Sequence, residues 1–528
     1  MSSFEMVHHQ HITGKLACID RLIFKGHLTG LFGPGRFKAF LASQGVLLKV
    51  FAPYVKRVSE DLKAHAQRLA AGAGRPYIYL EGAMTKAGGL SKEDYARAIA
   101  ERDQISKGLI CVLATVEPCR SFDVRGNRDT QMLEVIRRAR KCLHFYFYYL
   151  DPRLGLIHVR LQGWFPFEVQ VWVNGHYALA KALDARGIGY AMNGNAFARI
   201  DDLPAAQRLA DSLAARSWPR LLTALARRVN PMLTVIEHAG FGGYYWVVDQ
   251  SEVSTDVIFS SRPALEQVTP EIFAHATTAF GAEDVLRFLG RKLHPALAAE
   301  VGTSTRRRPE GWRVRHRLGR NSIKVYDKGN CLRVETTIND PSQLRAWRVT
   351  ERLTGTGSRR RLARVRELAP VRKGVASLRT IYQAGKAANE RYLDALTAAA
   401  CHGEAVRSLD DLCRPRVRGR RRHSSFSPLS ARDLGIFRAV LAGEHAITGF
   451  ANRDLTQRMH PRPPADEAEA KRRCASTSRL IAKLRGHGLI QKIPKRRRYR
   501  LTRHGQRLMT AILLVHDRDI PDAYAAAA

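Results

Sequence analysis

The segment NSIKVYDKGNCLRVETTIND, residues 321–340, restricts the fold more tightly than any other stretch of this chain. Two runs of alternating apolar and polar residues flank Gly329-Asn330, a dipeptide typical of a two-residue hairpin turn. Counting outward from this turn predicts the cross-strand pairs Lys328–Cys331, Asp327–Leu332, Tyr326–Arg333, Val325–Val334 and Lys324–Glu335. A shift of one residue would turn every side chain to the opposite face, so the pattern predicts a single register.

This register gives the hairpin two faces of opposite character. One face is predicted to be core and carries Ile323, Val325, Leu332 and Val334, with Asp327 at its rim. The other face carries the candidate catalytic residues Lys324, Tyr326, Lys328, Arg333 and Glu335. The three cations can grip a phosphate and lower the pKa of the phenol for attack, with Glu335 as metal ligand or base. A solvated face held by a Lys324–Glu335 pair and a Tyr326–Arg333 stack is the structural alternative.

The same residues resemble a known signature. Tyr326-Asp327-Lys328 followed by Leu332-Arg333-Val334-Glu335 is similar to the YDK…LRxE signature of replication initiators from rolling-circle plasmids and filamentous phages. The resemblance implies a domain that nicks single-stranded DNA through a tyrosine with a divalent metal, Mg²⁺ or Mn²⁺, and that a winged helix can accompany. The candidate nucleophiles are Tyr326, Tyr244 and Tyr245. The chain departs from the family pattern in its short spacer between the half-motifs.

Further carboxylates lie in YYWVVDQSEVSTDVIF, residues 244–259. Asp249, Glu252 and Asp256 are close in sequence and, with Glu335, are the candidate metal ligands. A divalent ion held by such carboxylates can neutralise the charge that builds on phosphate oxygens during phosphodiester cleavage. The alternative is a polar turn with Asx or Ser caps that joins two strands.

A basic strand, GWRVRHRL, precedes the hairpin. Alternation places Arg313, Arg315 and Arg317 on one face of this strand and apolar residues on the other. We expect the three arginines to contact nucleic acid.

The C-terminal part of the chain opens with RPRVRGRRRH, residues 414–423. This run is too dense in charge to be expected to fold, and it suits contact with phosphates. Its candidate nucleic-acid contacts are Arg418, Arg420, Arg421 and Arg422.

A folded module is expected after this run. Helices are predicted at Leu429–Leu441, Asn452–Met459 and Ala475–Arg485, followed by a hairpin in IQKIPKRRRYRL. Three helices and a basic hairpin resemble the winged-helix family, in which the third helix enters the major groove and the wing contacts backbone or minor groove. The contacts that this resemblance implies are Ser478, Arg479, Lys483, Lys495, Arg496, Arg497 and Arg498. The insert at 460–473 lengthens the turn before the third helix.

Composition agrees with a polyanionic partner. The chain has 528 residues with 87 Lys plus Arg against 48 Asp plus Glu, a formal charge of +39. Such a charge destabilises a compact chain unless a polyanion neutralises it. We expect the partner to be nucleic acid, with DNA favoured and a structured RNA as the alternative.

The eight cysteines form no CxxC pair, so neither a zinc site nor a disulfide framework is predicted. Without a secretory or membrane-spanning segment, the expected location is the bacterial cytoplasm, in association with the nucleoid.

The expected fold class is α+β and multidomain, with mixed or antiparallel sheets, flanking helices and a C-terminal winged helix. The expected units are an α/β domain at 1–119, a β-rich domain with an aromatic hairpin at 120–232, an α+β candidate catalytic domain at 233–345, a basic linker with a helix at 346–428, and the winged helix at 429–515. A helix is expected at Gln131–Lys141, and Phe145–Tyr149 is expected to be a strand buried on both faces.

These features favour a nucleic-acid-processing protein of a mobile element or small replicon, which the winged helix directs to its site and whose central region nicks or joins a DNA strand. One alternative is a non-catalytic or RNA-associated component that binds a large structured nucleic acid. A transcriptional regulator is the second alternative, although it leaves four-fifths of the chain without a role.

Overall fold

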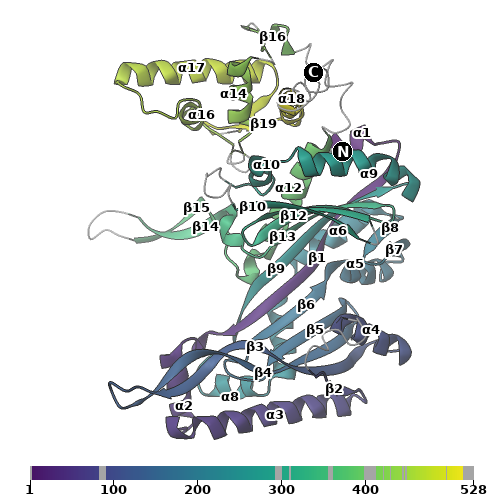
Figure 1. Ribbon diagram of the computed structural model, residues 1–528, viewed down its shortest axis with the longest axis vertical. Helices are drawn as coiled ribbons and strands as arrows, with labels where there is room; N and C mark the ends of the chain where they lie inside the picture. Colours follow the sequence, from purple (N-terminus) through teal and green to yellow (C-terminus); the bar gives the residue numbers. More distant parts are fainter. Residues whose placement is uncertain are drawn as a thin grey trace, which may run out of the picture.

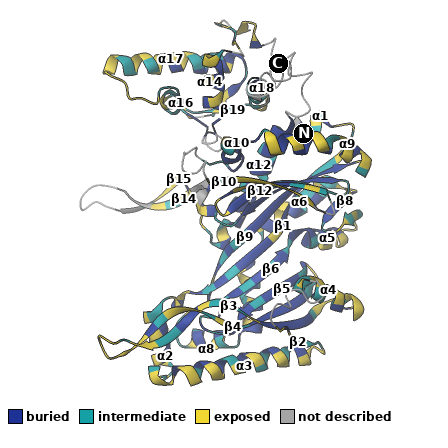
Figure 2. Cartoon of the chain, in the orientation of Figure 1, coloured by how far each residue is buried: buried dark blue, intermediate teal, exposed yellow. Residues whose placement is uncertain are grey.

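The computed structural model describes residues 3–81, 91–291, 300–308, 311–354, 361–397, 412–419, 421–427, 430–442, 445, 449–494, 496–514 and 516. Helices and strands both contribute extensively, and the predicted α+β class is confirmed. A large sheet occupies the centre of the molecule, and the C-terminal module lies at one end of it (Figure 1). Buried residues concentrate in the strands, whereas the outer surface of α3 and the tip of the β3–β4 hairpin are exposed (Figure 2).

One eleven-stranded sheet joins the first three expected units. Its order is β10-β11-β12-β13-β9-β1-β6-β5-β4-β3-β2. The strands are β1 (Ile12–Leu28), β2 (Tyr77–Tyr79), β3 (Gly108–Gly126), β4 (Leu133–Asp151), β5 (Gly155–Gln162), β6 (Val169–Asn174), β9 (Tyr244–Phe259), β10 (Val301–Arg308), β11 (Gly311–Leu318), β12 (Asn321–Lys328) and β13 (Cys331–Ile338). The expected boundary at 119/120 falls inside β3, so 1–119 and 120–232 share one sheet rather than forming separate units.

The sheet consists of two halves with the same topology. In the first half, the long strand β1 is followed by the antiparallel meander β3–β6, whose last strand returns to pair with β1. In the second half, the long strand β9 is followed by the meander β10–β13, whose last strand returns to pair with β9. The two long strands pair antiparallel with each other at the centre. Side chains from both halves therefore meet where β1 and β9 run side by side.

Helices cover the sheet. In the first half, α2 (Pro34–Ser43), α3 (Phe51–Gly72), α7 (Trp218–Val229) and α8 (Met232–His238) pack on one apolar core. In the second half, α9 (Arg262–Thr278), α10 (Ala282–Phe288) and α12 (Leu378–Leu396) pack on another. Smaller cores lie under α4 (Lys92–Arg102), and under α5 (Gly175–Asp184), α6 (Leu203–Ala215) and the hairpin β7 (Tyr190–Asn193)–β8 (Ala196–Ile200).

The register predicted for the 321–340 hairpin is confirmed. Each predicted pair, from Lys328–Cys331 to Lys324–Glu335, is present between β12 and β13. The apolar face with Val325 and Val334 is fully buried in the second-half core, as expected. The aromatic strand is also buried on both faces, because Phe145 and Phe147 join one core and Tyr146 and Tyr148 join another.

Two sequence interpretations in this region are wrong. Of the residues 131–141 that were expected to be helical, 133–141 form the start of strand β4, because they pair with β3 along its distal half. Residues 244–259 contain no turn; they form one continuous strand, β9.

The segment expected to be a basic linker is ordered structure. Strands β14 (Arg345–Thr354) and β15 (Arg361–Pro370) form a hairpin that projects from the body (Figure 1). Helix α12 packs on β9 and β13, with Ala388, Tyr392 and Leu396 in the second-half core. Within the described part of this span, residues 346–354 and 361–397 therefore form strands and a helix, and α12 belongs to the second-half core.

The C-terminal module has its own core. Its elements are α14 (Ala431–Val440), α16 (Asn452–Met459), α17 (Glu467–Gly486), the hairpin β18 (Ile490–Lys492)–β19 (Tyr499–Leu501) and α18 (Arg503–Leu514). The order of three helices and a hairpin follows the expectation. The third helix starts eight residues earlier than predicted, because Asp466 caps it and residues 467–473 of the insert are helical.

The basic run at 414–423 also differs from expectation. Instead of staying unfolded, it forms a small hairpin of β16 (Arg416–Arg418) and β17 (Arg421–His423) around Gly419, whose φ is +60°. Arg418 anchors this hairpin to α17 by donating to the Arg485 carbonyl at 2.6 Å.

Candidate active site

A polar pocket of about 410 Å³ lies where the two long strands meet the β12–β13 hairpin. Its walls include Asp20 and Arg21 from β1, Glu252 from β9, and Lys324, Tyr326 and Glu335 from the hairpin. With Arg313 of β11 also in its lining, the pocket draws side chains from five strands and from both halves of the sheet.

Three buried carboxylates meet at this pocket. Asp20, Glu252 and Glu335 each offer an oxygen, and these oxygens all lie within 4.8 Å of one another. The three residues are only 5%, 7% and 1% exposed. Asp20 reaches the cluster through an irregularity of β1, because Ile19 pairs with Val253 and Arg21 with Glu252, which leaves Asp20 as an extra residue. Such a β-bulge re-aims side chains locally.

Glu335 links the carboxylates to Tyr326. The Tyr326 hydroxyl donates to Glu335 Oε2 at 2.7 Å, and Lys324 Nζ lies 2.5 Å from Oε1. The expectation that neighbouring cations lower the pKa of Tyr326 is wrong, because burial and the Glu335 charge raise that pKa well above its usual value. The phenol is therefore neutral in this arrangement, and the carboxylate beside it is placed to accept its proton.

Glu252 is the least compensated of the three acids. Its nearest cation is Arg21, with Nε 3.8 Å from Oε2, and Gln250 donates to Oε1 at 2.7 Å. Burial and the neighbouring Glu335 raise the pKa of Glu252 to about 7. Two carboxylates at this distance disfavour being ionised together unless a cation joins them.

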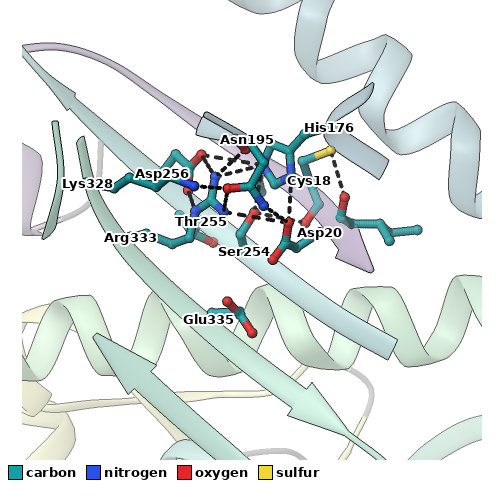
Figure 3. Close-up of polar contacts among 12 residues, drawn as sticks. Cys18, Asp20, His176, Asn195, Ser254, Thr255, Asp256, Lys328, Arg333 and Glu335 are labelled. Atoms are coloured by element: carbon teal, nitrogen blue, oxygen red, sulfur yellow. Dashed lines mark hydrogen bonds and ion pairs between the residues drawn. The ribbon is translucent and has the colours of Figure 1, made fainter. Parts of the chain in front are cut away.

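Asp20 is fixed by a buried network behind the pocket (Figure 3). Its Oδ1 accepts from Asn195 Nδ2 at 2.8 Å, lies 3.0 Å from His176 Nδ1 and lies 3.6 Å from Arg333 Nη1. Although burial alone would raise the pKa of Asp20, the Arg333 charge and the His176 contact lower it below its usual value. Asp20 is therefore a carboxylate that stays ionised.

Arg333 belongs to this network and does not line the pocket. The side chain is fully buried and donates from Nε and Nη2 to the two carboxylate oxygens of Asp256, each at 2.7 Å. Its Nη2 also lies 3.1 Å from His176 Nε2 (Figure 3). The expectation that Arg333 grips a phosphate is therefore wrong, because its hydrogen-bonding capacity is used inside the protein. Asp256, expected as a metal ligand, is the partner of Arg333 instead.

Asp249 also lies outside the carboxylate cluster. The neighbouring β1 residues Ile23 and Phe24 pair with Gln250 and Val248 of β9. Asp249 therefore has no partner on β1 and forms a bulge in β9. Among the residues described, the cluster gains Asp20 in place of Asp249 and Asp256.

Of the three candidate nucleophiles, only Tyr326 lines this pocket. Tyr244 is buried at the start of β9 and donates to the Phe167 carbonyl at 2.6 Å. Tyr245 is 53% exposed beside Gly374.

The cations around the pocket are arranged by the strand register. Arg313 pairs with Tyr326 and Arg315 with Lys324, so the predicted basic face of β11 lies on the same side of the sheet as the phenol. Arg313 lines the pocket, whereas Arg317 is exposed further along the strand. Lys328 contacts Asn195 Oδ1, and burial together with Arg333 lowers the pKa of Lys328.

The expected nucleic-acid contacts of the C-terminal module differ in their surroundings. Ser478 and Arg479 on α17, Arg496 and Arg497 in the β18–β19 hairpin, and Arg418, Arg421 and Arg422 are exposed. Lys483 lies over the Phe426 ring, 3.8 Å from its centroid. Arg498 donates to the Gly449 carbonyl and to Asp454. Arg420 and Lys495 lie outside the described residues.

The pocket fits a hard divalent cation. Its candidate ligands are carboxylate oxygens, which Mg²⁺ and Mn²⁺ prefer. The buried Glu335 Oε1 makes no hydrogen bond, although the Lys324 ammonium lies beside it. The residues that would hold the ion are Asp20, Glu252 and Glu335.

Sequence reasoning missed three residues that complete the site. Asp20 has a signal in the sequence, since it is an isolated acid within the apolar strand ITGKLACIDRLIF. His176 and Asn195 have none that we find, because their contacts to Asp20 span 156 and 175 residues of chain.

Two further results bear on the identity of the chain. Within the described residues, every helix is too short or too polar to cross a membrane. Comparisons with protein-family models, with curated proteins and with solved structures return nothing that matches the chain.

Proposed function

We propose that the chain is a metal-dependent DNA nicking and strand-transfer enzyme of a mobile element or replicon, with Tyr326 as the nucleophile. The observation that carries the proposal is the 2.7 Å hydrogen bond from the Tyr326 hydroxyl to Glu335, a carboxylate that also belongs to the acidic cluster. A nucleophile in hydrogen-bond contact with a base, itself oriented by a third group, is the arrangement that covalent catalysis requires. Here the third group is Lys324.

The reaction follows from these positions. Tyr326 Oη attacks the phosphorus of a DNA phosphodiester, and its proton passes to Glu335 Oε2. The new Oη–P bond forms as the bond from phosphorus to one deoxyribose oxygen breaks, and that oxygen leaves with a proton taken from solvent. The strand is then held as a phosphotyrosine ester. Attack by a deoxyribose hydroxyl on this ester reverses the step and joins the strands without an external energy source.

Charged side chains at the pocket stabilise the negative charge that builds on the phosphate oxygens during the reaction. Lys324 and Arg313 lie where they can contact the non-bridging oxygens of the phosphate. A divalent ion bound by Asp20, Glu252 and Glu335 would supply further charge neutralisation at those oxygens. The buried Arg333–Asp256 pair and His176 keep Asp20 ionised and in place. Preorganised charge of this kind stabilises the transition state without reorganisation.

The C-terminal module supports a role in site recognition. We infer that it acts as a winged helix, with α17 presenting Ser478 and Arg479 to the major groove and the β18–β19 hairpin presenting Arg496 and Arg497 to the backbone.

Labelled single-stranded DNA incubated with the full chain and Mg²⁺ or Mn²⁺ tests the proposal. The wild type is expected to cleave the strand and to leave a covalent protein–DNA adduct on a denaturing gel. Tyr326→Phe should lose the adduct and retain DNA binding, whereas Tyr146→Phe, a tyrosine with a similar carboxylate contact elsewhere in the sheet, should keep both. A wild-type protein that never cleaves with either metal contradicts the nuclease assignment.

The +39 charge favours one other candidate, a non-catalytic component bound to a large structured RNA. Sequencing the nucleic acid that copurifies with the protein from its host separates the two. A discrete RNA together with absent cleavage supports this second role.

A further inference from the structure

The first half of the sheet contains a larger cavity than the active-site pocket. Its volume is about 750 Å³, and it lies between the far end of β1, the β3–β4 hairpin and the end of β5. Its walls include the cationic or titratable residues Lys25, His27, Arg120, Arg137, Arg138 and Arg160. We call this cavity the basic groove.

Part of the positive charge in the basic groove is already compensated. Lys25 and His27 pair with Glu168, at 2.7 and 3.3 Å. Arg160 pairs with Glu117, and Arg138 with Asp123. Two other residues, Arg120 and Arg137, are exposed and have no acidic partner among the described residues. The groove therefore contains two uncompensated guanidinium groups in addition to internal ion pairs.

Aromatic rings lie beside these cations. The Phe32 ring is 67% exposed, which is unusual for so large an apolar side chain, and the Arg137 guanidinium lies over it at 4.7 Å from the centroid. Outside the lining of the groove, the Arg140 guanidinium lies over the partly exposed Trp164 ring, 4.2 Å from its centroid. An exposed aromatic ring beside arginine, as Phe32 is beside Arg137, is the kind of surface on which unpaired bases stack in single-strand binding proteins.

The basic groove and the active-site pocket share one strand, β1. Arg21 lines the pocket and Lys25 lines the groove, and both project from β1. Four residues of a β-strand span about 13 Å. Between them on the neighbouring β6 lies Trp172, whose ring is covered by the Arg21 guanidinium at 5.3 Å.

We propose that the basic groove binds the single-stranded DNA adjacent to the phosphodiester bond in the active-site pocket. The proposal rests on the nicking function proposed above. Duplex DNA is disfavoured as the occupant, because a paired base has no free face to stack on Phe32. The phosphates of an unpaired strand contact Arg120 and Arg137, and one of its bases stacks on Phe32 or inserts between Phe32 and Arg137.

Binding of a fluorescent single-stranded oligonucleotide to the full chain without metal tests this proposal. The double variant Phe32→Ala/Arg137→Ala is expected to bind the single strand at least tenfold more weakly and with a smaller dependence of affinity on salt. Leu47→Ala/Arg186→Ala, matched exposed residues outside the groove, should bind as the wild type does. Thermal unfolding of both variants checks that each is folded.

The outcomes separate this inference from the proposed function. If the groove variant binds single-stranded DNA as tightly as the wild type, the inference is wrong, whether or not the protein nicks DNA. If the groove variant loses affinity while the wild type never forms an adduct, the assignment of single-strand binding to the groove is supported and the proposed nicking function is wrong. Equal losses for duplex and single-stranded DNA, or a preference of the wild-type groove for RNA of the same sequence, would overturn the assignment to single-stranded DNA.

Discussion

The two halves of the central sheet contain the same local contact in different surroundings. In the second half, Tyr326 donates to Glu335 at 2.7 Å and Lys324 lies 2.5 Å from that carboxylate. In the first half, Tyr146 donates to Glu117 at 2.7 Å and Lys92 lies 2.5 Å from Glu117. A tyrosine, a glutamate and a lysine in contact are therefore not enough to identify a catalytic site.

The difference lies in what else surrounds each glutamate. Arg160 adds a second cation at Glu117, with Nη2 2.8 Å from Oε2, and these contacts lower the pKa of Glu117 to about 2 despite its burial. Glu335 instead has two more buried carboxylates beside it. One half has excess positive charge at its glutamate and the other has excess negative charge. Only the acidic cluster around Glu335 is therefore expected to bind a further cation.

The largest expected effect is a loss of nicking activity when the Tyr326–Glu335 contact is removed. Glu335→Gln removes the proton acceptor and one carboxylate of the cluster, and we expect nicking to fall by about 1,000-fold or more. Glu117→Gln, the matched change in the first half, should alter the nicking rate by less than about threefold, because no reacting group contacts it. Single-turnover cleavage of labelled DNA measures both. Equal losses would mean that the two halves are not functionally distinct.

The next effect is on stability and comes from the buried Arg333. Arg333→Met leaves Asp256 ionised without its partner, and breaking such a buried pair costs about 3–5 kcal/mol. Arg160→Met should cost less, about 1–2 kcal/mol, since Arg160 remains 20% exposed and Lys92 still compensates Glu117. Urea unfolding of the two variants gives the comparison. Arg333→Met/Asp256→Leu is expected to recover most of the loss, and failure to do so would show that the pair is not the source of the effect.

The two halves should also respond to pH in opposite directions. Because the folded pKa of Glu252 is raised to about 7, the folded state binds more protons than the unfolded state from about pH 4.5 to 7, so this group costs stability as pH rises through that window. Because the folded pKa of Glu117 is lowered to about 2, its contribution is present above about pH 4.5 and is lost as pH falls toward 2. The shift at Glu252 corresponds to roughly 3 kcal/mol, and the shift at the more exposed Glu117 contributes less, because solvent screens its interactions.

Unfolding free energies measured from pH 3 to 8 check these slopes. Glu252→Gln should remove the decline in stability between about pH 4.5 and 7, and Glu117→Gln should reduce the loss of stability below about pH 4.5. Millimolar Mg²⁺ or Mn²⁺ should raise the melting temperature of the wild type above pH 7 and leave Glu252→Gln unchanged, since only ionised ligands bind the metal. A metal-induced shift that persists in Glu252→Gln would place the ion elsewhere.

The smallest effect concerns Tyr146. Removing its hydroxyl in Tyr146→Phe loses one hydrogen bond to a charged acceptor, and the expected cost is about 1 kcal/mol with nicking unaffected. Calorimetry and the adduct gel check this together. Loss of the adduct in this variant would assign chemistry to the first half.

Local patterns in the sequence predicted local structure well. The Gly329-Asn330 turn fixes the register of its hairpin, because alternation and turn length leave no second solution. The helix at Asn452–Met459 is as predicted, to the residue. The helix predicted at 131–141 is wrong because residues 133–141 gain strand structure from pairing with β3 rather than from their own propensity.

The site was predictable only where it lies within the hairpin. Tyr326 and Glu335 are nine residues apart, and their contact follows from the register. The position of Arg333 on the polar face was predicted correctly, but its burial was not, because α5 and the β7–β8 turn bring His176 and Asn195 over it from elsewhere in the chain. Asp20 required knowledge that β1 and β9 pair and that β1 carries an extra residue at that point.

The pairing of β1 with β9 has a practical consequence for protein engineering. Asp20 comes from one long strand and Glu252 from the other, so neither topological half contains all three carboxylates. The loop between His238 and Tyr244 connects the halves and includes Gly240 and Gly242. Two polypeptides divided at this loop would each lack part of the acidic cluster, and the pocket would be complete only after they reassociate. The fold thus offers a natural division for a conditional, two-component version of the protein.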